Sequence, residues 1–180
     1  MLKERQLHDK IFTPFISEKE IYLSISNLTQ ELQKDYEGKE ILFIAILNGS
    51  FMFASDLMKF YDQDAVISFI KVSSYSGIHT TGRVDELIGL NTSVQGKHIV
   101  ILEDIVDTGI TIDKVITLLK SNYPESVEVC TLLFKPESFR GKNKPKYIGF
   151  KIPNKFVVGY GLDYNELGRN LKELYQLKEE

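Results

Sequence analysis

The sequence predicts an α/β domain with a central, mostly parallel sheet flanked by helices. Two runs of consecutive apolar residues, 41–47 and 99–102, are typical of parallel strands that are buried on both faces. Each run leads into a short polar loop, and apolar residues at helical spacing follow the loop. Strands that alternate with helices in this way favour a parallel sheet whose binding site lies at the carboxyl edge.

Length and composition are those of one soluble globular domain, residues 1–180. The chain is 43% hydrophobic and 26% charged, and at 20.6 kDa it can bury a substantial core. A net charge of -3 argues against a nucleic-acid-binding surface, and no apolar run is long enough for a membrane span. Cys130 is the single cysteine, and the first ten residues lack the apolar segment of a secretory signal. We therefore expect a cytoplasmic protein without disulfides or membrane contacts.

A helix is predicted over residues 18–36. Ser17 and Glu20 are spaced as a capping box, in which each side chain bonds the backbone N–H of the other residue. Apolar residues then recur at helical spacing, namely Ile21, Ile25, Leu28 and Leu32. Gly38 is a suitable C-terminal stop, and the apolar stripe of the helix would pack on the sheet.

The first apolar run, 41–47, ends in the loop Asn48-Gly49-Ser50, and a second helix follows. The N-terminus of that helix offers an anion site, although an ordinary connection explains the loop equally well. Residues 65–72 are predicted as the next strand, and residues 84–90 fit the return limb of a hairpin. The polar, Gly- and Ser/Thr-rich residues 73–82 between them are either a lid or a disordered surface loop.

The second apolar run ends at two adjacent acids, Glu103 and Asp104. The loop Asp107-Thr108-Gly109 follows, and then a helix from near Thr111. A strand, a small polar loop and a helix present backbone N–H groups to a phosphate. Free carboxylates repel a phosphate, so the acids are explained if they hold ribose hydroxyls or bind a hard cation such as Mg²⁺. The alternative is an ordinary turn whose acids only solvate the strand end.

Three features follow toward the C-terminus. Residues 127–134 are predicted as another apolar strand, and Lys135 ends it at the same edge as Glu103. Residues 140–146 are a basic loop, which we interpret as a solvated surface in preference to an RNA contact. Residues 156–164 combine aromatic and β-branched residues with glycines that permit close backbone approach.

The stretch from residue 99 to Thr111 resembles the phosphoribosyl-pyrophosphate (PRPP) signature of the type I phosphoribosyltransferases. Over nearly its whole length the chain is similar to the hypoxanthine-guanine phosphoribosyltransferases of that family. Five segments carry the match in the family's order, namely residues 47–50, Ser74-Tyr75, residues 103–111, Lys135, and residues 153–166 with Arg169. The last segment separates this subfamily from other proteins with the PRPP motif.

The resemblance implies a Rossmann-like fold with a flexible lid at about residues 73–91 and a small C-terminal hood at about 145–180. It implies Mg²⁺-dependent purine salvage, in which hypoxanthine or guanine takes the phosphoribosyl group of PRPP and pyrophosphate leaves. It further implies a homodimer or a homotetramer. The alternatives are a regulator that senses nucleotides while binding RNA or DNA, and a phosphoribosyltransferase for xanthine or another base.

The same resemblance assigns the site residues. PRPP would be bound by Glu103, Asp104, Asp107, Thr108, Gly109, Ile110 and Thr111, and pyrophosphate by Asn48, Gly49 and Arg169. The base would meet Lys135 at its 6-oxo group, the Phe156 ring by stacking, the Val157 backbone at its 2-position, and Asp163. Ser74 and Tyr75 would close over the reacting centre from the lid. Mg²⁺ would be held by Glu103, Asp104 and Asp163, and Asp107 would be the general base at N7 of the purine.

One position departs from the family pattern. Many relatives carry Lys where this chain has Asn48. A backbone N–H of the loop can still bind pyrophosphate, but the ammonium contact is missing here. This departure bears on the affinity for pyrophosphate and on any cross-subunit role of the side chain.

Overall fold

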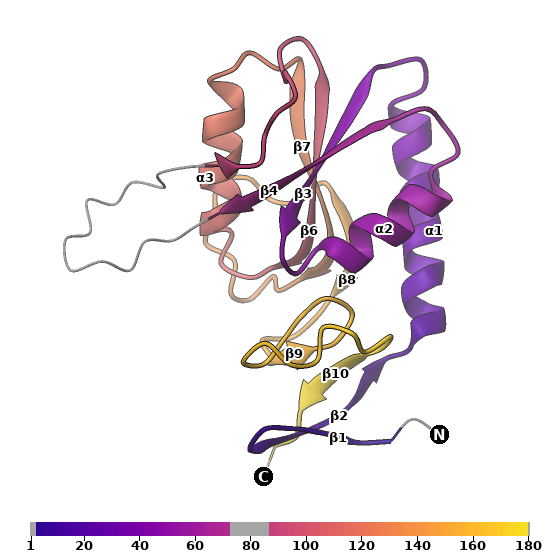
Figure 1. Cartoon of the computed structure of the whole chain (residues 1–180), viewed down its shortest axis with the longest axis vertical. Helices are drawn as coiled ribbons and strands as arrows, with labels where there is room; N and C mark the ends of the chain where they lie inside the picture. The colour runs from indigo at the N-terminus through magenta and orange to yellow at the C-terminus, as the bar shows by residue number, and fades with distance from the viewer. Residues whose placement is uncertain (1–2, 73–86, 180) are drawn as a thin grey trace, which may run out of the picture.

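The computed structural model describes residues 3–72 and 87–179 of the chain, and within them the strands form two separate sheets (Figure 1). The larger sheet contains β3 (Ile41–Leu47), β4 (Val66–Val72), β5 (Leu87–Ile88), β6 (His98–Val106), β7 (Ser126–Phe134) and β8 (Tyr147–Lys151). The smaller sheet contains β1 (Arg5–Leu7), β2 (Lys10–Ile16), β9 (Val157–Val158) and β10 (Leu174–Leu177). The helices are α1 (Glu18–Asp35), α2 (Phe51–Phe60) and α3 (Ile110–Lys120).

The larger sheet is mostly parallel, with strand order β5-β4-β3-β6-β7-β8. Of its described strands only β5 is antiparallel, and it pairs with β4 at one edge. Helices α1 and α2 lie on one face and α3 on the other (Figure 1). Because both faces are covered, β3 is an unbroken apolar run. This arrangement confirms the predicted α/β fold.

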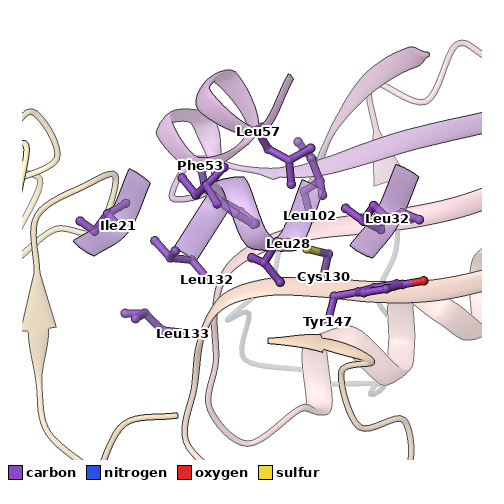
Figure 2. Packing of buried hydrophobic residues seen from close by; sticks show 14 of the residues in the cluster. Ile21, Leu28, Leu32, Phe53, Leu57, Leu102, Cys130, Leu132, Leu133 and Tyr147 are labelled. Atoms are coloured by element: carbon purple, nitrogen blue, oxygen red, sulfur yellow. The ribbon is translucent and has the colours of Figure 1, made fainter. Parts of the chain in front are cut away.

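Two hydrophobic clusters fix the helices against the sheet. The larger one lies between the sheet and helices α1 and α2, where it joins Leu28, Leu57 and Leu102 (Figure 2). The second cluster packs Ile112 and Leu119 of α3 against the opposite face. Packing on both faces fixes where the N-termini of α2 and α3 lie relative to the carboxyl edge of the sheet.

Helix α1 begins with the predicted capping box. The Glu20 N–H donates to Ser17 Oγ (3.3 Å), and the Ser17 N–H donates to Glu20 Oε2 (2.9 Å). Tyr36 is the C-cap, so the predicted end is also confirmed. The predicted apolar stripe is buried at all four positions, Ile21, Ile25, Leu28 and Leu32.

The smaller sheet is built from both ends of the chain, which come together beneath the larger sheet (Figure 1). We call this sheet, together with residues 159–169, the hood. Strand β10 lies between β2 and β9 and pairs antiparallel with both. Residues 5–16 thus belong to the hood, which the sequence placed at 145–180 alone, whereas β8 within that range pairs in the larger sheet. Partners so distant in sequence leave no local pattern, and periodicity therefore does not predict β1 and β2.

Strand β6 is longer than the sequence predicts. Its ladder with β7 continues past Leu102 and pairs Glu103 with Thr131 and Val106 with Phe134. The expectation that the two acids end the strand is therefore wrong, because they lie within it. The neighbouring strand supplies backbone partners that outweigh the weak strand preference of acidic residues.

Part of the predicted hairpin and lid can be located. Strand β5 pairs Leu87 with Val72 and Ile88 with Lys71, as expected for a return limb. Ser74 and Tyr75, and the proposed lid up to residue 86, lie outside the described residues. None of the helices in the described ranges is long and apolar enough to cross a membrane.

We predict that Ser17→Ala lowers the free energy of unfolding by about 1 kcal/mol, because the Glu20 N–H loses its side-chain acceptor. Urea denaturation measures the change. Asn27→Ala, on the exposed face of the same helix, is the control and should cost no stability. Equal losses in the two variants would show that the capping box does not stabilise α1.

Candidate active site

Three loops leave the carboxyl ends of neighbouring parallel strands and meet at one edge of the larger sheet. Strand β3 continues into Asn48-Gly49-Ser50, β6 into Asp107-Thr108-Gly109, and β7 into Lys135. These loops are neighbours because β6 is hydrogen-bonded to β3 on one side and to β7 on the other. The hood adds a fourth segment, since Gly161 packs against the carbonyl oxygen of Gly49. Four of the five segments that the sequence assigned to one site therefore lie together, and the fifth, Ser74-Tyr75, lies outside the described residues.

The loop before α3 leaves the N-terminus of that helix open. Gly109 is the N-cap, with a φ of 81°, and it has no side chain to cap the helix; the Thr108 hydroxyl accepts only a long hydrogen bond from the Ile110 N–H (3.5 Å). A Cβ at Gly109 would lie 2.3 Å from the Phe139 ring, so glycine satisfies both the backbone conformation and this contact. Thr108, Ile110 and Thr111 are exposed beside it. Free N–H groups and hydroxyls at a helix N-terminus form a site for an anion such as a phosphate.

The loop after β7 supports this helix N-terminus, in addition to the Phe139 contact. The Arg140 N–H donates to the carbonyl oxygen of Thr108 (3.0 Å). On α3, Asp113 accepts hydrogen bonds from residues 142 and 143. The basic composition of residues 140–146 predicts only a solvated surface and does not indicate this role. The available signal was Phe139, an aromatic residue in an otherwise polar stretch.

Asp104 is buried where β6 passes the loop at Gly49. A Cβ at Gly49 would lie 1.6 Å from Asp104 Oδ2, so this close approach requires glycine. Asp104 Oδ1 accepts a hydrogen bond from the Ile105 N–H (2.8 Å). Burial raises the pKa of Asp104 to about 6, against the opposing effects of backbone N–H groups and of the Arg169 charge.

Glu103 carries a buried oxygen, Oε2, that has no hydrogen-bond partner among the described residues. Burial, and after it the charge of Asp104, raises the pKa of Glu103 well above its ordinary value. A buried carboxylate without a partner is unfavourable unless it is protonated or meets a cation or a donor. The two acids therefore suit a hard cation or the hydroxyl groups of a ligand.

Lys135 and Asp107 form an ion pair at the ends of β7 and β6. The distance from Lys135 Nζ to Asp107 Oδ2 is 2.9 Å. The lysine side chain is 9% exposed and the aspartate side chain 43%, so the carboxylate side of the pair is open to a ligand. The Lys135 N–H also donates to the Val106 carbonyl oxygen (3.0 Å), which ties the two strand ends together. A donor and an acceptor thus stand side by side.

In the hood, Asp163 pairs with Arg169 at 2.6 Å between Oδ1 and Nη2. Asp163 Oδ2 accepts from the Glu166 N–H (2.7 Å), and Arg169 Nη1 donates to the Gly161 carbonyl oxygen (2.8 Å). Both charges are near enough to Asp104 to affect its pKa. Within residues 3–72 and 87–179, no three acidic, His or Cys side chains converge on one point. Glu103, Asp104 and Asp163 therefore do not surround a single metal position.

Phe156 presents an aromatic surface at the hood. Its ring is 46% exposed and is supported edge-on by Tyr164 (5.9 Å between centroids) and at a tilt by Phe12 (6.2 Å). The neighbouring residue, Val157, is buried and its backbone pairs with Gln176 of β10. An exposed aromatic ring that is held by neighbouring rings is suited to stacking on a planar ligand.

Comparisons with known proteins agree with this geometry. A model of the phosphoribosyl transferase domain matches residues 16–165. A hypoxanthine-guanine phosphoribosyltransferase of Staphylococcus aureus is 42% identical over 175 residues, which are 97% of this chain and 98% of that protein. A crystal structure of a hypoxanthine-guanine phosphoribosyltransferase from Bacillus anthracis has a TM-score of 0.83 at 35% identity, over 92% of this chain and 96% of that one. A mutant hypoxanthine phosphoribosyltransferase from Trypanosoma cruzi, in a ternary complex with substrates, has a TM-score of 0.83 at 32% identity, over 92% and 94%.

We predict that Asp104→Asn stabilises the metal-free protein at alkaline pH. The pKa of Asp104 is raised on folding, so its ionised form is disfavoured in the folded state. This penalty is complete above about pH 6, falls as the pH falls, and is absent below about pH 4. The variant should therefore exceed the wild type in free energy of unfolding by about 1–3 kcal/mol at pH 8, and the two should converge near pH 4.

Thermal and urea unfolding in the presence of chelator measure this difference. Asp64→Asn replaces an exposed acid and is the control, which should leave the pH dependence unchanged. If Asp104→Asn were no more stable than the wild type at pH 8, the unfavourable burial of this carboxylate would be refuted.

Proposed function

The chain belongs to the phosphoribosyltransferase family, and we propose that it transfers the 5-phosphoribosyl group of PRPP to hypoxanthine or guanine in purine salvage. The products are IMP or GMP, and pyrophosphate. Relatives that are named for this activity match nearly the full length of the chain at 42% and 35% identity. The substrates of the enzyme are therefore PRPP and a purine base.

The observation that carries the choice of a 6-oxopurine is the Lys135–Asp107 pair. A 6-oxopurine presents an acceptor at O6 next to a donor at N7–H. Lys135 Nζ donates and Asp107 accepts, and their polar atoms are 2.9 Å apart, so one edge of the base meets both. Adenine presents an amino donor in place of O6, and it would oppose the ammonium of Lys135. With adenine the ammonium would keep only Asp107 as its partner and would lose the hydrogen bond to the base, so adenine is disfavoured.

Phe156 supplies the stacking surface for the base. Its exposed ring packs against Phe12 and Tyr164. Stacking on aromatic side chains contributes about 1–3 kcal/mol per base in comparable sites. We assign the backbone of Val157, the residue after Phe156, to the 2-position of the base, where hypoxanthine, guanine and xanthine differ.

The transfer breaks the bond between the ribose carbon and pyrophosphate and forms the bond to the purine nitrogen. The open N-terminus of α3, with residues 107–111, holds the 5′-phosphate of PRPP. Arg169 and the loop at Asn48-Gly49 hold the leaving pyrophosphate. Asp107 takes the proton from N7, and a positioned general base of this kind contributes typically ~10²–10⁴-fold.

We propose that Mg²⁺ assists the reaction at two positions. Glu103 and Asp104 suit an ion beside the ribose hydroxyls, because Glu103 Oε2 is buried without a partner in the described part of the chain and burial raises both pKa values. Asp163 suits an ion on the pyrophosphate, where Arg169 exchanges its carboxylate partner for the ligand. When bound, Mg²⁺ supplies screening of the negative charge that develops on the leaving group.

The basic loop at 140–146 gives little support to a nucleic-acid-binding regulator. Arg140 Nη1 donates to two carbonyl oxygens of its own loop. Lys146 pairs with Asp35 at 2.7 Å, and Lys144 Nζ lies 5.9 Å from the centroid of the Phe134 ring. Because these cations are engaged within the domain, and because the chain has a net charge of -3, the enzyme is favoured.

We further propose a homodimer or homotetramer in the cytoplasm. The family resemblance supports the assembly, and sedimentation of the purified chain tests it. The thiol of Cys130 supports a reducing compartment, since it is free and fully buried. Burial raises the pKa of this thiol, so it remains protonated and unreactive.

We predict that the protein, incubated with PRPP, Mg²⁺ and separate purines, forms nucleotide from hypoxanthine or guanine and none from adenine. Excess chelator should abolish the reaction, and added Mg²⁺ should restore it, because the acids of the site are unsuited to face pyrophosphate without a cation. Chromatography of the products measures both effects. Absence of any nucleotide would refute the enzymatic function. Nucleotide formed from xanthine alone would refute the proposed base. Full turnover in excess chelator would refute the requirement for Mg²⁺.

We predict different losses for the two members of the ion pair. Lys135→Ala should lower kcat/KM for hypoxanthine, because the donor to O6 is lost. The ratio of kcat/KM for hypoxanthine to kcat/KM for adenine should fall as well. Asp107→Asn should chiefly lower kcat, by up to ~10²-fold or more, while PRPP still binds. Steady-state kinetics with each base measure these changes. Lys135→Ala with unaltered base preference, or fully active Asp107→Asn, would contradict the corresponding role.

A further inference from the structure

A hydrogen bond between Tyr160 and Asp56 joins the hood to α2. The Tyr160 hydroxyl donates to Asp56 Oδ2 (2.5 Å), and Lys59 Nζ lies 2.8 Å from Asp56 Oδ1. Tyr160 is 1% exposed and Asp56 is 7% exposed, so the bond lies in the interior. Burial and the Asp56 bond raise the pKa of Tyr160, which keeps its hydroxyl a donor. None of the assigned roles at the site uses this pair.

Tyr160 immediately precedes the hood residue that touches the pyrophosphate loop. A Cβ at Gly161 would lie 2.0 Å from the Gly49 carbonyl oxygen, so the two backbones are in direct contact. Gly161 is also bonded twice to Arg169, through its N–H to the Arg169 carbonyl oxygen (2.9 Å) and through its own carbonyl oxygen to Nη1 (2.8 Å). A shift of Tyr160 would therefore displace both the loop contact and the Arg169 side chain.

Asp56 is connected to the other side of the same contact. It lies on α2, whose N-cap is Ser50, the residue after Gly49. The Ala54 N–H donates to the Ser50 carbonyl oxygen (2.8 Å), so the loop end is part of the helical hydrogen-bond pattern. Because a short helix moves as one body, the position of Asp56 is coupled to that of the loop.

We propose that Tyr160 and Asp56 are positioning residues for the pyrophosphate half of the site. Their bond holds the hood segment that carries Asp163 and Arg169 against the loop at Gly49. The segment and the loop then contact the leaving pyrophosphate together. The inference rests on the proposed function. The purine half has its own anchor on β10, since Val157 pairs with Gln176 and the Phe156 carbonyl oxygen accepts from the Leu177 N–H (2.9 Å).

The chain contains a second network of the same composition, which serves as a matched control. The Tyr147 hydroxyl donates to Asp35 Oδ2 (2.8 Å), and Lys146 Nζ lies 2.7 Å from the same oxygen. Tyr147 is fully buried and begins β8, at the amino edge of the parallel sheet and therefore away from the site. Tyr147→Phe and Tyr160→Phe thus each remove a tyrosine hydroxyl that donates to an aspartate; the bond to Asp56 is buried and the bond to Asp35 is partly buried.

Steady-state kinetics of these two variants test the proposal. Tyr160→Phe should raise the KM for PRPP and the inhibition constant of pyrophosphate by about tenfold, since a misplacement of ~1 Å can cost up to ~10²-fold. Its KM for hypoxanthine should stay within about twofold of the wild type, because the purine contacts are unchanged. Tyr147→Phe should leave all three constants unchanged while lowering the melting temperature to a similar extent.

Two substitutions of Asp56 distinguish an effect on the position of Tyr160 from a general loss of stability. Asp56→Asn keeps an acceptor oxygen for Tyr160 and should retain a KM for PRPP closer to the wild type than Asp56→Ala does. The inference alone would be overturned if Tyr160→Phe and Tyr147→Phe changed the KM for PRPP equally. It would also be overturned if Tyr160→Phe changed the KM for PRPP and the KM for hypoxanthine equally. A wild-type protein that forms no nucleotide would overturn the proposed function and the inference with it.

Discussion

The parallel backbone ladder of β6 with β3 and β7 is the interaction on which the site depends. It brings three strand ends to one edge, so that the loop at Gly49, the open end of α3 and Lys135 become neighbours. The ladder continues through Glu103 to Val106, and the acids are therefore held by a strand instead of a loop. Their burial and their raised pKa values follow from that position.

The charges of the site fall into two groups. Lys135 with Asp107, and Arg169 with Asp163, are paired within the protein. The adjacent acids on β6 are not paired in this way among the described residues: burial raises the pKa of both, and the charge of Asp104 raises the pKa of Glu103 further. This division suits the reaction, because a neutral base needs a donor beside an acceptor, whereas ribose hydroxyls and a cation need acceptors alone.

The hood makes the ends of the chain part of the site. Strand β2 contributes Phe12, whose ring supports Phe156, and the Tyr164 hydroxyl donates to Asp9 Oδ1 (2.9 Å). Strand β10 then joins this N-terminal hairpin to β9. The surface assigned to base stacking therefore depends on residues from both ends of the chain, although the reacting groups lie at the sheet edge.

The sequence by itself determined the elements whose signals are contiguous. The capping box at Ser17 located the start of α1, the apolar runs located β3 and β7, and the motif from Glu103 to Thr111 indicated the phosphate site, because caps, periodicity and loop chemistry act over a few residues. Only the tertiary structure decided which distant residues touch. The hood strands β1 and β2, the Lys135–Asp107 pair and the approach of Gly49 to the β6 acids depend on strand order and on close packing, and neither is encoded in any local stretch of the chain.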